Sequence, residues 1–234
     1  MIVAFENQTA RAAKAATEEI PVVFLHVSDP VAEGLVKTLA RPGGNLSGFV
    51  YYVVSPAKRL ELFKEIVPGL RRVLVLVDPR DPVAPGHLAQ IRTAADVLKL
   101  RLVQRNVAAQ ADLQLVFGAI KPVDVDGVIS ASVDLDLKFT SLLIGLTAAK
   151  RLPLATYRKE RVREGALFSY APDIASVGPP AAEYVDRILK GARPGDLPVA
   201  QLTKFEMAIN LKTARTLGLT IPRSLLARAD EVVR

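Results

Sequence analysis

The side chains in this sequence that could hold a small molecule are acids, serines and tyrosines that follow short apolar runs. The positions directly after such runs are Ser28 and Asp29, Asp78, the segment 132–134, and Tyr157. Carboxylates suit an ammonium group, tyrosine rings suit an apolar or aromatic group, and a helix N-terminus suits a carboxylate. Together these groups describe a site for an amino acid or a similar small zwitterion. The alternative for any single Asp or Ser is a structural role as a helix N-cap.

Motifs of known catalytic sites are absent from the sequence. We find no phosphate-binding glycine loop, no dinucleotide fingerprint and no Gly-x-Ser-x-Gly elbow. His26 and His87 belong to no metal-binding pair, and His26 is interpreted as a packed, hydrogen-bonded core residue. Residues 55–58 match Ser-x-x-Lys by letter, but Pro56 makes a helix start the simpler interpretation. We therefore expect no enzyme, no catalytic residue, no cofactor and no metal site.

Composition indicates a globular protein with a sizeable core, because 50% of the 234 residues are hydrophobic and 24% are charged. The net charge of +7 comes from Lys and Arg scattered along the chain, often beside acids, as in 59–61 and 64–65. We interpret them as a solvated surface and expect no nucleic-acid partner. Cysteine is absent, no run has the apolar length of a membrane span, and residues 1–6 lack the features of a signal peptide. The chain as given is therefore expected to be soluble and cytoplasmic.

Short apolar runs alternate with segments of helical periodicity, which predicts an α/β fold built from βαβ units. The expected strands are 1–5, 21–27, 46–54, 72–77, 100–105, 127–131, 154–157 and 206–209. The expected helices are 8–17, 31–39, one that begins at 55–56, 84–98, 111–120, 134–150, 159–164, one from 179 or 180 to 189, 210–217 and 222–227. Ligands of parallel α/β sheets bind beyond the carboxyl ends of the strands, so the residues at those ends are the candidates for a site.

Several segments, in order along the whole chain, resemble one bacterial family. They are 20–24, 29–31, 34–36, 39–49, 58–62, 68–70, 168–173, 184–191, 197–199, 203–206, 209–214 and 217–222. The sequence resembles the ABC-transporter substrate-binding proteins, in particular the tryptophan/tyrosine-type transport components.

The resemblance implies a type I periplasmic-binding protein fold with two Rossmann-like lobes joined by three crossover segments. We expect residues 1–48 plus 171–204 in the first lobe and 49–170 plus 205–234 in the second. The implied partners are a small-molecule ligand, held by hinge closure between the lobes, and the ABC permease subunits of the inner membrane. The ligand would be an amino acid, aromatic in the tryptophan/tyrosine type, and the location would be periplasmic or membrane-associated.

The cleft residues expected on this basis are Ser28, Asp29, Asp78, Asp134, Tyr157, Ser169, Tyr170 and Asp173. Asp29 or Asp134 would meet an ammonium, helix N-termini would meet a carboxylate, and the tyrosine rings would stack on the side chain of the ligand.

The sequence departs from the family at its beginning. Family members usually carry an export signal and further βα units before the stretch equivalent to 2–4, so we expect an incomplete, N-terminally truncated first lobe with an uncovered apolar sheet edge. Two alternatives stay open, namely a ligand-sensing regulatory domain that uses the same clamp, and a truncated non-functional fragment.

Overall fold

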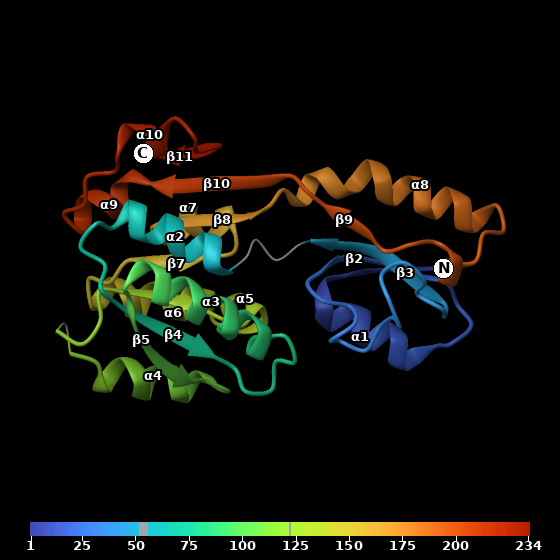
Figure 1. The fold of residues 1–234 in the computed structure, drawn as a ribbon, viewed down its shortest axis with the longest axis horizontal. Coiled ribbons are helices and arrows are strands. Elements are labelled where there is room, and N and C mark those ends of the chain that lie inside the picture. The colour runs from blue at the N-terminus through green and yellow to red at the C-terminus, as the bar shows by residue number, and fades with distance from the viewer. Residues whose placement is uncertain (52–55, 122) are drawn as a thin grey trace. The chain divides into compact units, whose positions relative to one another are not determined.

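The computed structural model describes residues 1–51, 56–121 and 123–234. The chain folds into two compact units, Met1–Val53 with Pro172–Lys204, and Val54–Ala171 with Phe205–Arg234. Each unit is a sheet covered by helices (Figure 1). The predicted α/β class with two Rossmann-like lobes is therefore confirmed. Ser55, the expected helix start and the first letter of the Ser-x-x-Lys match, lies outside the described residues.

The first unit is built around a four-stranded sheet of order β1-β2-β3-β9 in which neighbours run parallel. Its strands are β1 (Ile2–Phe5), β2 (Val22–Val27), β3 (Leu46–Tyr51) and β9 (Ala200–Leu202). Helix α1 (Glu6–Ala16) packs Ala10 and Ala13 on one face, and α8 (Gly178–Leu189) packs Ala181 and Ile188 on the other. The two helices lie on opposite sides of the strands in Figure 1. Two short 3₁₀ turns, η1 (Ile174–Val177) and η2 (Pro194–Asp196), flank α8.

Strand β1 forms one edge of this sheet and carries exposed apolar side chains. Val3 is 53% exposed and Phe5 is 38% exposed. Val3 pairs with Val23, and Phe5 pairs with Leu25. Both side chains therefore lie on the same face of the sheet as α8, but α8 packs over β2 and β3 rather than over β1. The expected uncovered apolar edge is thus present at β1.

The second unit has a seven-stranded sheet of order β11-β10-β8-β7-β6-β4-β5. The strands are β4 (Arg72–Val77), β5 (Arg101–Asn106), β6 (Gly127–Ser130), β7 (Leu154–Thr156), β8 (Phe168–Pro172), β10 (Phe205–Asn210) and β11 (Glu231–Val233). The neighbouring strands β5, β4, β6, β7 and β8 pair in parallel. Asp173 donates its N–H to the Lys204 carbonyl and Asn210 donates to Leu167, so β10 runs antiparallel to β8.

Alternate residues of β4 feed two separate cores, as the period of two of a strand requires. Val73, Val75 and Val77 pack with α2 (Pro56–Ile66) and α3 (Ala84–Leu98). Leu74 and Leu76 pack on the opposite face with α4 (Gln110–Ala119) and α6 (Thr140–Ala149). The remaining helices are α5 (Val133–Lys138), α7 (Lys159–Glu164), α9 (Leu211–Thr216) and α10 (Arg223–Leu226). Within the ranges that the structure describes, no helix is long and apolar enough to cross a bilayer.

Two predicted helices are wrong. Segment 31–39 forms turns, because Gly34 adopts φ +66° and the amides of Leu35 and Val36 return to the Pro30 carbonyl. Segment 134–150 is not one helix but α5 and α6, separated at Phe139, whose ψ of 17° leaves the helical region. Phe139 packs against the α4 and α6 core there, so tertiary packing overrides helix propensity.

Other boundaries agree closely with prediction. Helices 84–98 and 159–164 match to the residue. Helix α8 begins at Gly178, one residue before the expected start, with Pro179 and Pro180 in its first turn. Gly191 has φ +100° after the helix end, as expected for a C′ glycine. The short strands β9 and β11 were not predicted, since three residues give too little periodicity.

Gly48 on β3 gives a test of the first unit's packing. A Cβ at this position would lie 1.9 Å from the carbonyl oxygen of Phe24 on β2, and that backbone atom has no freedom to move aside. We expect Gly48→Ala to lower the free energy of unfolding by at least about 3 kcal/mol in urea titrations.

Gly118 in α4 is the matched control, because an added Cβ there meets nothing within 4 Å. Gly118→Ala should stabilise by up to about 1 kcal/mol through helix propensity. Equal unfolding midpoints for the two variants would contradict the β2–β3 packing.

Candidate functional site

Polar groups of the second unit gather at the carboxyl ends of β4 and β6. The backbone N–H of Asp78, directly after β4, donates to Ser132 Oγ at 2.8 Å. Ser130 Oγ donates to the Ser132 carbonyl at 2.7 Å and accepts from the Ser132 N–H at 3.1 Å. Both serines are buried. The hydroxyls therefore fix the two loops that follow neighbouring strands to each other.

Tyr157, directly after β7, joins this cluster from the next strand. Its hydroxyl donates to the Ser130 carbonyl at 3.3 Å, and the residue is buried. The structure thus brings Asp78, Ser132 and Tyr157 together at one sheet edge, where their positions after parallel strands predicted them.

The carboxylate of Asp78 is neutralised by its own loop. Arg80 donates to it from Nε at 3.0 Å and from Nη2 at 2.9 Å. The hydrogen bonds from Arg80 lower the pKa of Asp78 below its ordinary value, although burial opposes them. Asp78 is therefore an anion whose oxygens are already engaged by a cation.

Arg59 of α2 is the residue that sequence reasoning missed. We interpreted segment 59–61 as solvated, whereas the Arg59 side chain is only 1% exposed. Nη2 donates to the Ser130 carbonyl at 2.9 Å, and Cζ lies 3.4 Å from the centroid of the Tyr157 ring. Helical spacing could have predicted that Arg59 is buried. It precedes Leu62 by three residues, Phe63 by four and Ile66 by seven, so it lies on the buried face of the helix with them.

His87 of α3 adds a further buried polar group near the same strand end. Its Nδ1 lies 2.9 Å from the Ala131 carbonyl, which can only accept, so Nδ1 carries the proton. Among the residues described, no group of three or more His, Cys, Asp or Glu could hold a metal ion.

The other expected site residues of this half of the sequence have separate environments. Asp134 lies in the first turn of α5 and is 3.7 Å from Lys138. Ser169 is buried on β8, and the Tyr170 ring lies 5.9 Å from that of Phe205. Asp173 caps η1, and its ion pair with Lys204 at 2.7 Å lowers the pKa of its carboxyl.

In the first unit Ser28 follows β2 and is held by Asn7 of α1. Asn7 Nδ2 donates to Ser28 Oγ at 2.9 Å, and the Ser28 N–H donates back to Asn7 Oδ1 at 3.0 Å. Nδ2 also donates to Glu33 Oε1 at 2.9 Å, and Glu33 pairs with Arg11. One oxygen of the exposed Asp29 accepts from the amides of Val31 and Ala32, which is the capping role named as its alternative.

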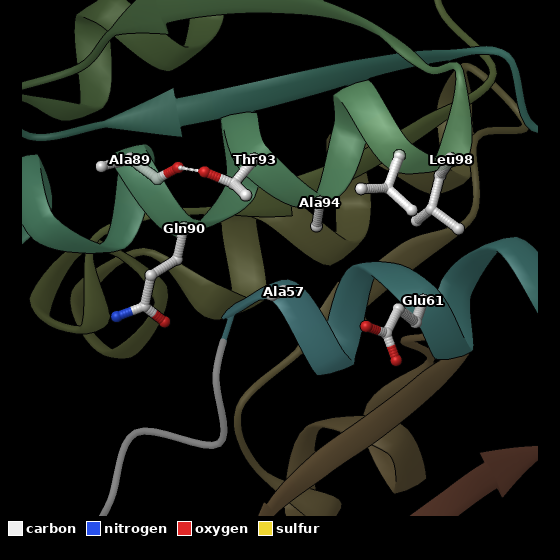
Figure 2. Close-up of a pocket in the computed structure, with 8 residues that line it drawn as sticks. Ala57, Glu61, Ala89, Gln90, Thr93, Ala94 and Leu98 are labelled. Atoms are coloured by element: carbon white, nitrogen blue, oxygen red, sulfur yellow. Dashed lines mark hydrogen bonds between the residues drawn. The ribbon is translucent and has the colours of Figure 1, made fainter.

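An apolar groove lies apart from these polar groups, between α2 and α3 (Figure 2). Its volume is about 550 Å³. It is lined by Ala57, Glu61, Ala89, Gln90, Thr93, Ala94, Val97 and Leu98. The Thr93 hydroxyl is turned back onto the Ala89 carbonyl at 3.1 Å, which leaves Glu61 and Gln90 as the other polar side chains of the lining.

The comparisons with known proteins identify the family. A family model described as "ABC transporter substrate binding protein" matches residues 1–233. This chain belongs to that family.

Relatives of the family agree with the observed fold. The tyrosine-binding protein of Clostridioides difficile is 28% identical over 225 residues, which are 94% of this chain and 63% of that protein. A conserved domain protein from Vibrio cholerae is 30% identical, with a TM-score of 0.88, over 99% of this chain and 78% of the other. An ABC domain in complex with L-Trp from Streptococcus pneumonia is 24% identical, also with a TM-score of 0.88, over 100% of this chain and 80% of the other. The chain spans less than two thirds of the length of the tyrosine-binding protein.

His26 gives this family member a specific pH dependence. It is packed as expected, with its ring 5.5 Å from that of Phe5, and burial lowers its pKa from 6.5 to about 4. Between these values the unfolded chain binds the extra proton, so stability is complete above pH 6.5 and is lost as the pH falls toward 4.

As the pH falls from 6.5 to 4, we expect the free energy of unfolding of His26→Asn to decrease by about 3 kcal/mol less than that of the wild-type chain. Urea unfolding at a series of pH values measures this difference. Asparagine tolerates the φ of +62° found here. An unchanged slope of stability against pH in this variant would contradict the buried neutral histidine.

Proposed function

We propose that this chain binds an aromatic amino acid and presents it to the permease of an ABC importer. The observation that carries the proposal is the buried cluster of Ser130, Ser132 and Tyr157 at the carboxyl edge of the second sheet, close to Asp78 and Arg59. This is the edge at which parallel α/β sheets bind ligands. The family membership and the tryptophan and tyrosine ligands named for two relatives support the same class.

The groups at the strand ends suit the parts of an amino acid. Tyr157 and Tyr170 offer aromatic faces for the side chain. Asp134 and Asp29 offer carboxylate oxygens to the ammonium group. Asp78 is a weaker candidate for that contact, because Arg80 already holds both of its oxygens.

The ligand would draw on both units, with Ser28, Asp29 and Asp173 from the first and the remaining residues from the second. Binding would then favour a closed arrangement through differential affinity for it, with the crossover segments near 48–50, 169–171 and 205–209 as hinges. Import would take place on the extracytoplasmic side, with the inner-membrane permease as partner.

A thermal melt with a panel of free amino acids and sugars tests the ligand class. A ligand that binds only the native state stabilises it by about 2.7 kcal/mol at a hundredfold excess over Kd. We expect tryptophan, tyrosine or phenylalanine to raise the Tm, and sugars to leave it unchanged. A Tm raised by sugars alone, or by no amino acid, would contradict the proposal.

Asp134→Ala and Asp29→Ala test the ammonium contact by calorimetric titration. Loss of a charge-assisted hydrogen bond of about 1.5–3 kcal/mol should weaken binding about 10- to 100-fold in at least one variant. Asp186→Ala is the matched control, because Asp186 forms the same (i, i+4) pair with Lys190 on α8 that Asp134 forms with Lys138. Unchanged affinity in both test variants would remove these residues from the site.

A further inference from the structure

We infer that Arg59 is the receptor for the carboxylate of the ligand and that Tyr157 positions it. The inference deepens the proposed function and rests on it, because it names the ligand group that the second unit recognises. It follows from the charge, the burial and the incomplete bonding of one guanidinium.

Arg59 is a buried cation without a counter-ion among the described side chains. It is 1% exposed, and it takes part in none of the ion pairs of that part of the chain. Nearby acids are engaged elsewhere, Asp78 by Arg80 and Asp134 by Lys138. A buried charge is strongly unfavourable unless an opposite charge or several hydrogen bonds compensate it.

The bonding of the guanidinium is also incomplete. Of its five N–H donors, Nη2 uses one on the Ser130 carbonyl at 2.9 Å, and Nε is buried with no hydrogen-bond partner among the described residues. Tyr157 covers one face of the guanidinium plane at 3.4 Å. Stacking leaves the in-plane N–H groups available, and these are the donors that match a planar carboxylate.

The position of Arg59 suits an anionic group for a second reason. It lies in the first turn of the 11-residue helix α2, where the helix dipole also favours negative charge. Its carbonyl partner, Ser130, is the last residue of β6, at the carboxyl edge of the sheet. Guanidinium and helix N-terminus therefore favour the same sign of charge at the edge where the polar cluster lies.

A purely structural role would give a different pattern of binding. If Arg59 only supports Tyr157 and the end of β6, its removal weakens every ligand equally. If it receives the carboxylate, its removal weakens only ligands that carry one. Ligands with and without the carboxylate therefore separate the two roles.

The test is calorimetric titration of the whole chain with L-tryptophan and L-tyrosine and with their amides, which keep the ammonium and the ring. The wild-type chain should bind the acids about 10- to 100-fold more tightly than the amides, as expected for a charge-assisted pair. Arg59→Gln should weaken binding of the acids by that factor and leave binding of the amides nearly unchanged. Arg59→Lys, which keeps the charge but loses the planar fork, should fall between.

Arg187→Gln is the matched control, because Arg187 also lies near a tyrosine ring, 6.0 Å from that of Tyr184, but on the exposed surface of α8. It should change neither affinity. If Arg59→Gln does not fold, as judged by circular dichroism, the comparison of acids with amides in the wild-type and Arg59→Lys chains still decides the question.

Equal wild-type affinity for acids and amides, or an equal loss for both in Arg59→Gln, would overturn the inference. A different result would show that only the amino-acid proposal is wrong. In that case amino acids do not bind, but simple aromatic carboxylates such as indole-3-propionate raise the Tm of the wild-type chain and leave the Tm of Arg59→Gln unchanged. If no carboxylate of either kind binds, the assignment of Arg59 is wrong.

Discussion

The parallel register of β4, β6 and β7 is the constraint on which the polar cluster depends. Val73 pairs with Gly127 and Val128 with Leu154, so the three strands end at nearly the same level. The register is fixed by side chains, because Val73 and Val75 enter one core while Leu74 and Leu76 enter the other. A slip of one residue would exchange these two sets and separate Asp78 from Ser132.

The two arginines at that edge, Arg80 and Arg59, differ in the groups that they contact. Arg80 makes a bidentate contact with Asp78 within one loop, so this pair contributes mainly to holding that loop. Arg59 has a carbonyl and an aromatic face, but no carboxylate among the described side chains. Burial of a charge without a counter-ion lowers stability. Arg80 has a carboxylate partner and Arg59 has none among the described side chains, and this difference is why we infer a binding function for Arg59.

Prediction from sequence succeeded where local chemistry decides the outcome. The apolar run 72–77 indicated β4, and Asp78, Ser132 and Tyr157 lie at the same sheet edge because each follows a parallel strand. Prediction failed where distant packing decides, as at Phe139, which interrupts a helical pattern to fill the core. Helical spacing could have indicated that Arg59 is buried, but its contact with Tyr157 could not be predicted, because the two residues are far apart in sequence. Asn7 and Glu33, which hold Ser28 in the first unit, are likewise long-range partners.

Nitrogen-15 NMR of the arginine Nε–H groups would report on the buried guanidinium itself. The Arg59 signal can be assigned by its absence from the spectrum of Arg59→Lys. We predict that saturating L-tryptophan or L-tyrosine shifts this signal and protects it from exchange, while tryptamine and tyramine leave it in place. A bound amino acid that leaves the Arg59 signal unmoved would show that the carboxylate is held elsewhere and would contradict the assignment of the binding edge.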